Sequence, residues 1–99
     1  MNNQVILIGR LVNEPTLDSD TKTCEITLAI YRDFKNEYGV YETDFIPVTL
    51  SGSIATNVVE WVKKGDMVAI RGKITRINEP MRIIADKVTF LSSKKQLDN

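Results

Sequence analysis

The side chains best suited to chemistry in this 99-residue chain are aromatic rings interleaved with cations. Phe34 lies between Arg32 and Lys35, and Phe45 follows further along the chain. A flat ring can stack on a nucleic-acid base, and a cation beside it can follow the phosphates. Weaker stacking candidates and further cations complete the set: Tyr31, Tyr38 and Tyr41, then Arg71, Lys73 and Arg76.

Catalytic chemistry has little support in the sequence. The chain has no histidine, which excludes His-dependent triads and the commonest zinc sites. It also has no Walker loop and no Gly-x-Gly-x-x-Gly, Gly-x-Ser-x-Gly or Cys-x-x-Cys motif. Two acidic pairs, Asp18 with Asp20 and Asp33 with Glu37, match no metal-binding loop and are typical of solvated turns. We therefore expect a protein that is not an enzyme and that uses no metal or cofactor.

The charges balance overall but not along the chain. Residues 1–62 hold 4 basic and 9 acidic side chains, whereas residues 63–87 hold 7 basic and 3 acidic ones. A cation-rich second half can be the footprint of a polyanion. It can equally be chance clustering on a solvated surface, so charge alone does not decide between the two.

Membrane and secretion signals are not evident. The longest apolar runs, such as residues 5–8, have four residues, whereas a membrane-spanning helix needs about 20. The N-terminus lacks a basic segment followed by a long apolar one, so we expect no signal peptide. Cys24 is the single cysteine, which rules out an internal disulfide and suits a reducing compartment. These features predict a cytoplasmic protein with no membrane partner.

The hydrophobic pattern predicts five strands and one helix in the order β-β-β-α-β-β. This is the chain order of the OB-fold, a five-stranded Greek-key barrel that is all-β apart from one helix. The polar segment 33–43 is expected to be a loop or a hairpin extending from its neighbouring strands. The strands are expected at 5–12, 24–31, 45–50, 67–77 and 81–91, the helix at 53–64, and a tight turn at 78–80.

Strand alternation and helical spacing predict the core. Ser53 is expected to cap the helix, Lys63 and Lys64 to lie in its last turn, and Gly65 to follow at the C′ position. Gly9 and Gly72 suit the strong coiling of barrel strands, with a bulge or bend at Gly9, and Pro47 predicts a free strand edge or a bulge. Core positions are expected at Cys24, Ile26, Leu28, Ile30, Ile46, Val48, Leu50, Ile54, Val58, Trp61, Val62, Val68, Ile70, Ile74 and Phe90.

The face formed by the second and third strands of an OB-fold commonly binds oligonucleotides. Phe45 points away from the predicted core on the third strand, although it could also lie in the core or in a subunit interface. The predicted binding residues are Phe34, Phe45, Arg32, Lys35, Arg71, Lys73 and Arg76, with Arg71 and Lys73 on the outward face of their strand.

Three segments together resemble the bacterial single-stranded DNA-binding protein (SSB) family. They are Asn3-Gln4-Val5-Ile6-Leu7-Ile8-Gly9-Arg10-Leu11 with Pro15, then Ile26-Thr27-Leu28-Ala29 with Glu42-Thr43-Asp44-Phe45, then Glu60-Trp61-Val62-Lys63-Lys64-Gly65-Asp66 with Val68, Ile70, Gly72 and Ile74. The resemblance implies an OB-fold that binds single-stranded DNA with little sequence preference. It also implies a homo-oligomer, a tetramer or a dimer, and it places the stacking positions of the family at Phe34 and Phe45.

The sequence departs from the family pattern at several positions. A third stacking aromatic of the family corresponds to Ser51 and a fourth to about Glu79. The long loop before the last strand shrinks to 78–80, and Thr75 stands where a cation is usual. These departures favour a weaker binder with a smaller footprint on DNA.

The end of the chain leaves two readings open. Members of the family typically continue into a flexible linker and an acidic-aromatic tip, whereas this sequence stops at Asn99. We expect an OB-fold domain at 1–91 and a short, polar, flexible tail at 92–99, in a tailless member or in a chain trimmed to this domain. Replication, recombination or mobile-element maintenance is the expected setting.

A second reading keeps the fold and changes the function. Residues 46–52 look like the third strand of primosomal replication proteins of the PriB type. In that reading the chain is a protein-interaction module with weak or vestigial DNA binding. Its main partner would be a replication or mobile-element protein.

Overall fold

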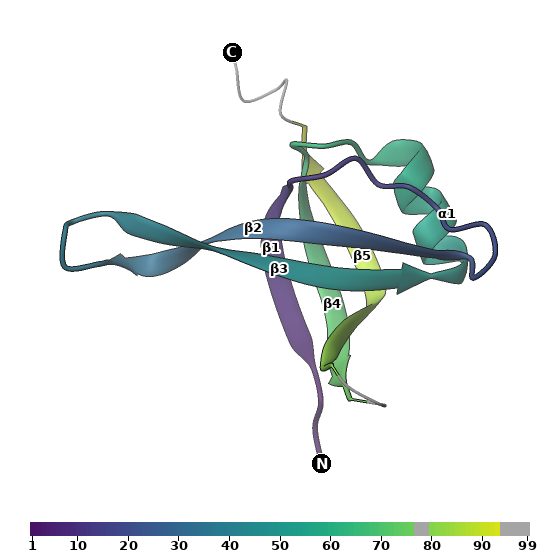
Figure 1. The fold of residues 1–99 in the computed structure, drawn as a ribbon, viewed down its shortest axis with the longest axis horizontal. Coiled ribbons are helices and arrows are strands. Elements are labelled where there is room, and N and C mark those ends of the chain that lie inside the picture. The colour runs from purple at the N-terminus through teal and green to yellow at the C-terminus, as the bar shows by residue number, and fades with distance from the viewer. Residues whose placement is uncertain (77–79, 94–99) are drawn as a thin grey trace.

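Five strands and one helix follow one another in the predicted order, β-β-β-α-β-β (Figure 1). The computed structural model describes residues 1–76 and 80–93, so part of the turn expected at 78–80 and most of the tail expected at 92–99 lie outside the described residues. The elements are β1 (Val5–Leu11), β2 (Thr23–Lys35), β3 (Tyr41–Ser51), α1 (Gly52–Trp61), β4 (Met67–Thr75) and β5 (Arg82–Ser92).

The strands close a barrel in the order β1-β2-β3-β5-β4, as expected for an OB-fold. Neighbouring strands are antiparallel except β3 and β5, which are parallel and meet at Thr49 and Ile84. In Figure 1 the β2–β3 ladder crosses in front of β1 and β4. The barrel encloses a core of Leu11, Cys24, Ile26, Leu28, Val48, Leu50, Ala55, Val58, Val62, Val68, Ile70 and Ala85.

Two glycines allow backbones to approach closely where the barrel coils. A Cβ at Gly9 would lie 2.7 Å from the Ala29 carbonyl oxygen and 2.8 Å from Ile30 Cγ1, so only glycine lets β2 cross β1 here. The β1–β4 register runs through Gly9 without a shift, so the expected bulge is absent there and close crossing is the reason for this glycine. Gly72 lies at a register shift between β4 and β5, against the Ile84 backbone.

The expectation for Pro47 is consistent with the ladder. Pro47 pairs with Thr27 of β2, and the described contact of β3 with β5 is two residues further on, at Thr49. Pro47 therefore needs no ladder hydrogen bond toward β5, which suits a residue without a backbone N–H.

The helix begins and ends earlier than expected. Its N-cap residue is Ser51, not Ser53, and the Ser51 side chain makes no capping hydrogen bond. The helix ends at Trp61 and contains no basic residue in its last turn, so Lys63 and Lys64 belong to the turn leading into β4. In that turn the Lys63 N–H donates to Asp66 Oδ2 at 2.9 Å, which stops the helix before the lysines.

Three residues expected in the core are exposed instead. Trp61 is 72% exposed, and Phe90 and Ile74 are also exposed. Each lies at or near the end of its element: Trp61 is the last helical residue, Ile74 the penultimate residue of β4, and Phe90 two residues before the end of β5. Periodicity predicts which face of a helix or strand points toward the core. It does not predict how far along that element the rest of the barrel still buries this face. Within the described part of the chain, no helix is long and apolar enough to cross a membrane.

Candidate nucleic-acid interface

Phe45 lies on the outer face of the β2–β3 ladder. It pairs with Ala29, and Pro47 pairs with Thr27 one row further along. Directly paired residues of antiparallel strands share a face of the sheet, so these four side chains form a continuous outer surface. The Phe45 ring is 62% exposed, which places it outside the core.

Beyond the barrel, β2 and β3 continue as a two-stranded arm, defined here as residues 31–44, which projects away from the body (Figure 1). The segment 33–43 is therefore a hairpin, one of the two structures expected for it. Asn36 orders the tip: its Oδ1 accepts hydrogen bonds from the N–H groups of Tyr38 at 2.9 Å and Val40 at 3.0 Å. Phe34 lies on the β2 side of the arm and is 69% exposed.

The two phenylalanines are separate platforms. Phe45 is opposite Ala29, and Phe34 is five residues beyond Ala29 on β2. The register shift between Tyr31 and Lys35 takes up two of these residues, so on β3 the ladder advances only four residues from Phe45 to Tyr41, the partner of Lys35. At a strand rise of about 3.3 Å per residue, the two rings are therefore roughly 10–13 Å apart along the ladder. They cannot sandwich one base between them, but each can receive a different one.

Arg32 is held by two carboxylates of β3. Its Nε and one terminal nitrogen donate to the two oxygens of Asp44 at 3.1 and 3.0 Å, and its other terminal nitrogen donates to Glu42 at 2.7 Å. The hydrogen bond and charge of Arg32 lower the pKa of Asp44, and the same contacts raise the pKa of Arg32. The guanidinium expected to meet phosphate is therefore occupied within the arm.

Lys35 is placed beside an aromatic ring of the arm. Its ammonium lies 5.6 Å from the centroid of the Tyr41 ring, and the two residues are paired across the ladder. This is the geometry of a cation–π contact at an exposed site. The cation remains at the surface of the arm one residue from Phe34.

The cations of β4 lie away from the aromatic face. In the closed barrel, β5 lies between β4 and β3, and the pairs Thr49–Ile84 and Ile84–Lys73 place Lys73 two strands away from the aromatic ladder. Arg71 donates to Asp86 of β5 at 2.8 Å, and Lys73 and Arg76 are exposed. The structure therefore does not bring Arg71, Lys73 or Arg76 next to Phe34 and Phe45.

One cation beside the aromatic face was missing from the sequence prediction. Because Thr49 and Ile84 are paired in parallel, the residues two before each, Pro47 and Arg82, are neighbours across the β3–β5 contact. Both also line the same two shallow hollows on this face. Arg82 is thus one row from Phe45. No local pattern could have revealed this, because the neighbourhood depends on how the barrel closes.

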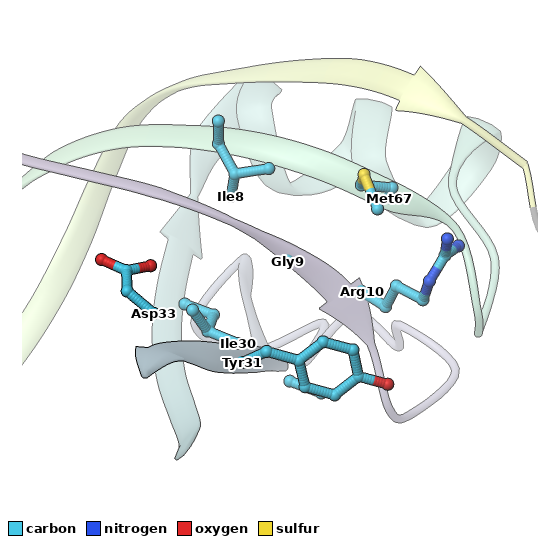
Figure 2. A pocket seen from close by; sticks show the side chains of 8 residues that line it. Ile8, Gly9, Arg10, Ile30, Tyr31, Asp33 and Met67 are labelled. Carbon is cyan, nitrogen blue, oxygen red and sulfur yellow. The ribbon is translucent and has the colours of Figure 1, made fainter. Parts of the chain in front are cut away.

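A groove separates the base of the arm from β1. The described register pairs β1 with β2 at Arg10 and Leu11, and past that point β2 diverges toward the arm. The space of about 330 Å³ has Ile8 and Met67 on one side and Tyr31 on the other, with Asp33 and Arg10 toward opposite ends (Figure 2). The Arg10 guanidinium donates to the Gly65 carbonyl at 3.1 Å, which fixes its position.

The closed five-stranded barrel, with a helix between its third and fourth strands and exposed rings on the β2–β3 face, defines an OB-fold protein with the features of a nucleic-acid binder. A sequence profile of the Single-strand binding protein family matches residues 2–91. The chain belongs to this family. Among the residues that the structure describes, no cluster of His, Cys, Asp and Glu could hold a metal ion.

Curated relatives cover nearly all of the chain. Single-stranded DNA-binding protein 1 of Clostridium acetobutylicum is 33% identical over 95% of this chain and 97% of its own length. Single-stranded DNA-binding protein B of Bacillus subtilis is 35% identical over 95% of this chain and 94% of its own. Single-stranded DNA-binding protein 1 of Streptococcus pyogenes is 41% identical over 79% of this chain, which corresponds to 62% of that protein.

The fold also matches a solved structure. A chain of the Plasmodium falciparum SSB complex with ssDNA superposes with a TM-score of 0.72, at 19% identity, over 93% of this chain and 97% of that one. At 19% identity the match supports the barrel topology alone.

Proposed function

We propose that this protein binds single-stranded DNA without strong sequence preference, through its OB-fold domain at residues 1–91. The observation that carries the proposal is the pair of exposed rings, Phe34 and Phe45, on the β2–β3 hairpin, with Lys35 following Phe34 in the chain and Arg82 one row from Phe45. Every base has a flat face, so stacking on such rings is tolerant of sequence. The names of the curated relatives support the same function.

The magnitudes are sufficient for useful affinity. A base stacked on an aromatic side chain contributes about 1–3 kcal/mol by alanine substitution. Two such stacks therefore supply a large part of the roughly 8 kcal/mol that a micromolar dissociation constant requires. Contacts from Lys35 and Arg82 to the phosphates add a salt-dependent share. The function requires no catalytic step, and we place it in the cytoplasm, where strands are opened during replication and recombination.

Arg71, Lys73 and Arg76 have a different part in this proposal. Because β5 separates β4 from the ladder that carries the rings, a short strand on Phe34 and Phe45 does not reach these cations. A longer strand that continues around the barrel can follow them. The sequence-predicted set therefore divides into a first contact site on β2 and β3 and an extension on β4.

We further propose that the protein acts as a homo-oligomer. Ile6 and Ile8 are exposed on β1, and the described β1–β2 register includes only Arg10 and Leu11. An apolar strand with an open edge is typically covered by another chain. A second copy seated on β1 would cover this edge and leave the outer face of Phe45 open.

The direct test is a fluorescence-anisotropy titration with labelled oligo-dT at low and at moderate salt, with a duplex of the same length as control. We expect saturable binding to the single strand, weakening as salt rises, and much weaker binding to the duplex. Absence of single-strand binding at low salt would overturn the proposal and favour the alternative of an interaction module for another replication protein.

A further inference from the structure

Phe34 belongs to the irregular part of the arm. The β2–β3 register is regular up to Tyr31 and Thr43 and resumes at Lys35 and Tyr41. Between these two pairs, β2 has three residues, 32 to 34, whereas β3 has one, Glu42. The extra residues form a bulge, so the regular ladder does not fix the segment that carries the ring.

Side chains tie this bulge together. Arg32 makes a two-pronged contact with Asp44 and a third hydrogen bond, of 2.7 Å, with Glu42. The other oxygen of Glu42 accepts a hydrogen bond of 3.3 Å from Asn36 Nδ2, and Asn36 also holds the tip. Phe34 lies midway between Arg32 and Asn36, and both are anchored on Glu42. The position of the ring is therefore set from both sides by one polar network.

The same network makes Arg32 a poor phosphate ligand. One guanidinium is paired with two carboxylates, so the cluster carries a net negative charge and does not attract phosphate. Three of the five guanidinium N–H groups, including the fork-shaped, charge-assisted pair to Asp44, are engaged within the arm. Only two N–H groups remain for a phosphate, and they belong to a guanidinium that is already paired with two carboxylates. The contacts therefore favour a role within the arm over a role on DNA.

We propose that Arg32 is a positioning residue that fixes the bulged arm so that Phe34 presents its ring to a base, and that it does not contact the phosphate backbone. This inference rests on the proposed function, because it assigns how one stacking residue of that site is held. Asp44 and Glu42 share the role, since they supply the oxygens that hold the guanidinium.

A double-mutant cycle tests the inference. Wild type, Arg32→Ala, Phe34→Ala and the double variant are titrated with labelled oligo-dT across a salt series. We expect Arg32→Ala to weaken binding by at least about threefold, and by no more than Phe34→Ala does. In a protein that already carries Phe34→Ala, adding Arg32→Ala should cause almost no further loss. The slope of log affinity against log salt should not change for Arg32→Ala.

Asp44→Asn is a control for which simple electrostatics and the positioning role predict opposite effects. It removes a negative charge from the binding face yet, as a positioning partner, should weaken binding in the same direction as Arg32→Ala. Amide NMR of residues 32–40 without DNA should show increased mobility in both variants, with the dispersion of the barrel signals retained.

The outcomes separate cleanly. Additive losses for Arg32→Ala and Phe34→Ala, together with a salt slope shallower by about 0.7, would make Arg32 a phosphate contact and overturn the inference. Tighter binding by Asp44→Asn, from a released Arg32, would overturn it as well. If instead wild type fails to bind, or Phe34→Ala binds as wild type does, the proposed stacking function is wrong. The NMR measurement without DNA still reports whether Arg32 orders the bulge.

Discussion

Phe45 stands directly opposite Ala29 on the outer face of the β2–β3 ladder, so the largest side chain of that row faces one of the smallest. The small partner leaves the Phe45 ring 62% exposed, so a base can lie flat against it. This pairing is the local reason why Phe45 is available for stacking although it lies on a strand that also builds the core.

Replacing Phe45 or Phe34 with alanine should cost about 1–3 kcal/mol of binding free energy each, or roughly 5- to 150-fold in affinity. The barrel should remain folded because both rings are exposed. Anisotropy titrations with oligo-dT measure the loss, and thermal unfolding checks the fold. Phe90→Ala is the matched control, since it removes an exposed phenylalanine from β5. Equal losses in all three variants would contradict a specific stacking face.

Arg82→Ala should reduce both the affinity and its salt dependence. Arg82 neighbours Pro47 across the barrel closure, one row from Phe45, where it can meet a phosphate of the stacked strand. Loss of one phosphate contact on single-stranded DNA lowers the salt slope by about 0.7. Lys87→Ala, which removes an exposed cation from the same strand, is the comparison. If the salt dependence of binding falls only for Lys87→Ala, the DNA strand passes Lys87 and not Arg82, which would contradict this prediction.

The contribution of Lys73 should depend on oligonucleotide length. A strand of about six nucleotides fits within the site size of one OB-fold and can occupy the rings without passing around the barrel. We expect Lys73→Ala to leave its affinity unchanged, and to weaken binding of a strand of about 30 nucleotides with a shallower salt slope. Titrations of both lengths against wild type and variant measure this. An equal loss at both lengths would show that β4 and the rings share one short site.

Binding should leave the intrinsic tryptophan fluorescence almost unchanged. Trp61 is the single tryptophan and closes α1, which lies on the side of the barrel away from the arm (Figure 1). In contrast, a Phe45→Trp, Trp61→Phe double variant should show quenching on addition of oligo-dT, because its indole then stacks on a base. Strong quenching of wild type would place the strand against the helix instead.

Between pH 5.5 and 8.5 the order of the arm should not change. The chain has no histidine, and Arg32 lowers the pKa of Asp44, so this carboxylate stays ionised throughout the range. A lowered pKa means that the pairing stabilises the arm above the ordinary aspartate value, near 4, and is lost as pH falls through the lower folded value. Amide NMR of the arm across pH measures this. Loosening above pH 5.5 would contradict the assignment.

Local patterns predicted the order of elements and the outward face of Phe45, because both follow from alternation within a single strand. They failed at Trp61, because the buried residues of α1 are Ala55 and Val58, followed by Val62 just after the helix, and the tryptophan lies at the margin of this stripe. Arg82 could not be found, because its place beside Pro47 depends on a parallel contact between segments far apart in sequence. The pairing of Arg32 was missed because it depends on the register of β2 against β3, which pairs Tyr31 with Thr43 and so brings Arg32 to Glu42 and Asp44.

The closure of the barrel has a consequence for its motions. The β2–β3 and β4–β5 ladders are long, whereas the described register joins β3 to β5 at a single pair, Thr49 with Ile84. We therefore expect the barrel to open first along this line, while β1 still joins the two hairpins through its pairs with β2 and β4. A strand of DNA that spans Phe45 and Arg82 crosses the same line. Ligand binding should therefore resist this opening, and we expect the amide hydrogens near Val48 and Leu50 to exchange more slowly in the occupied protein than in the empty one.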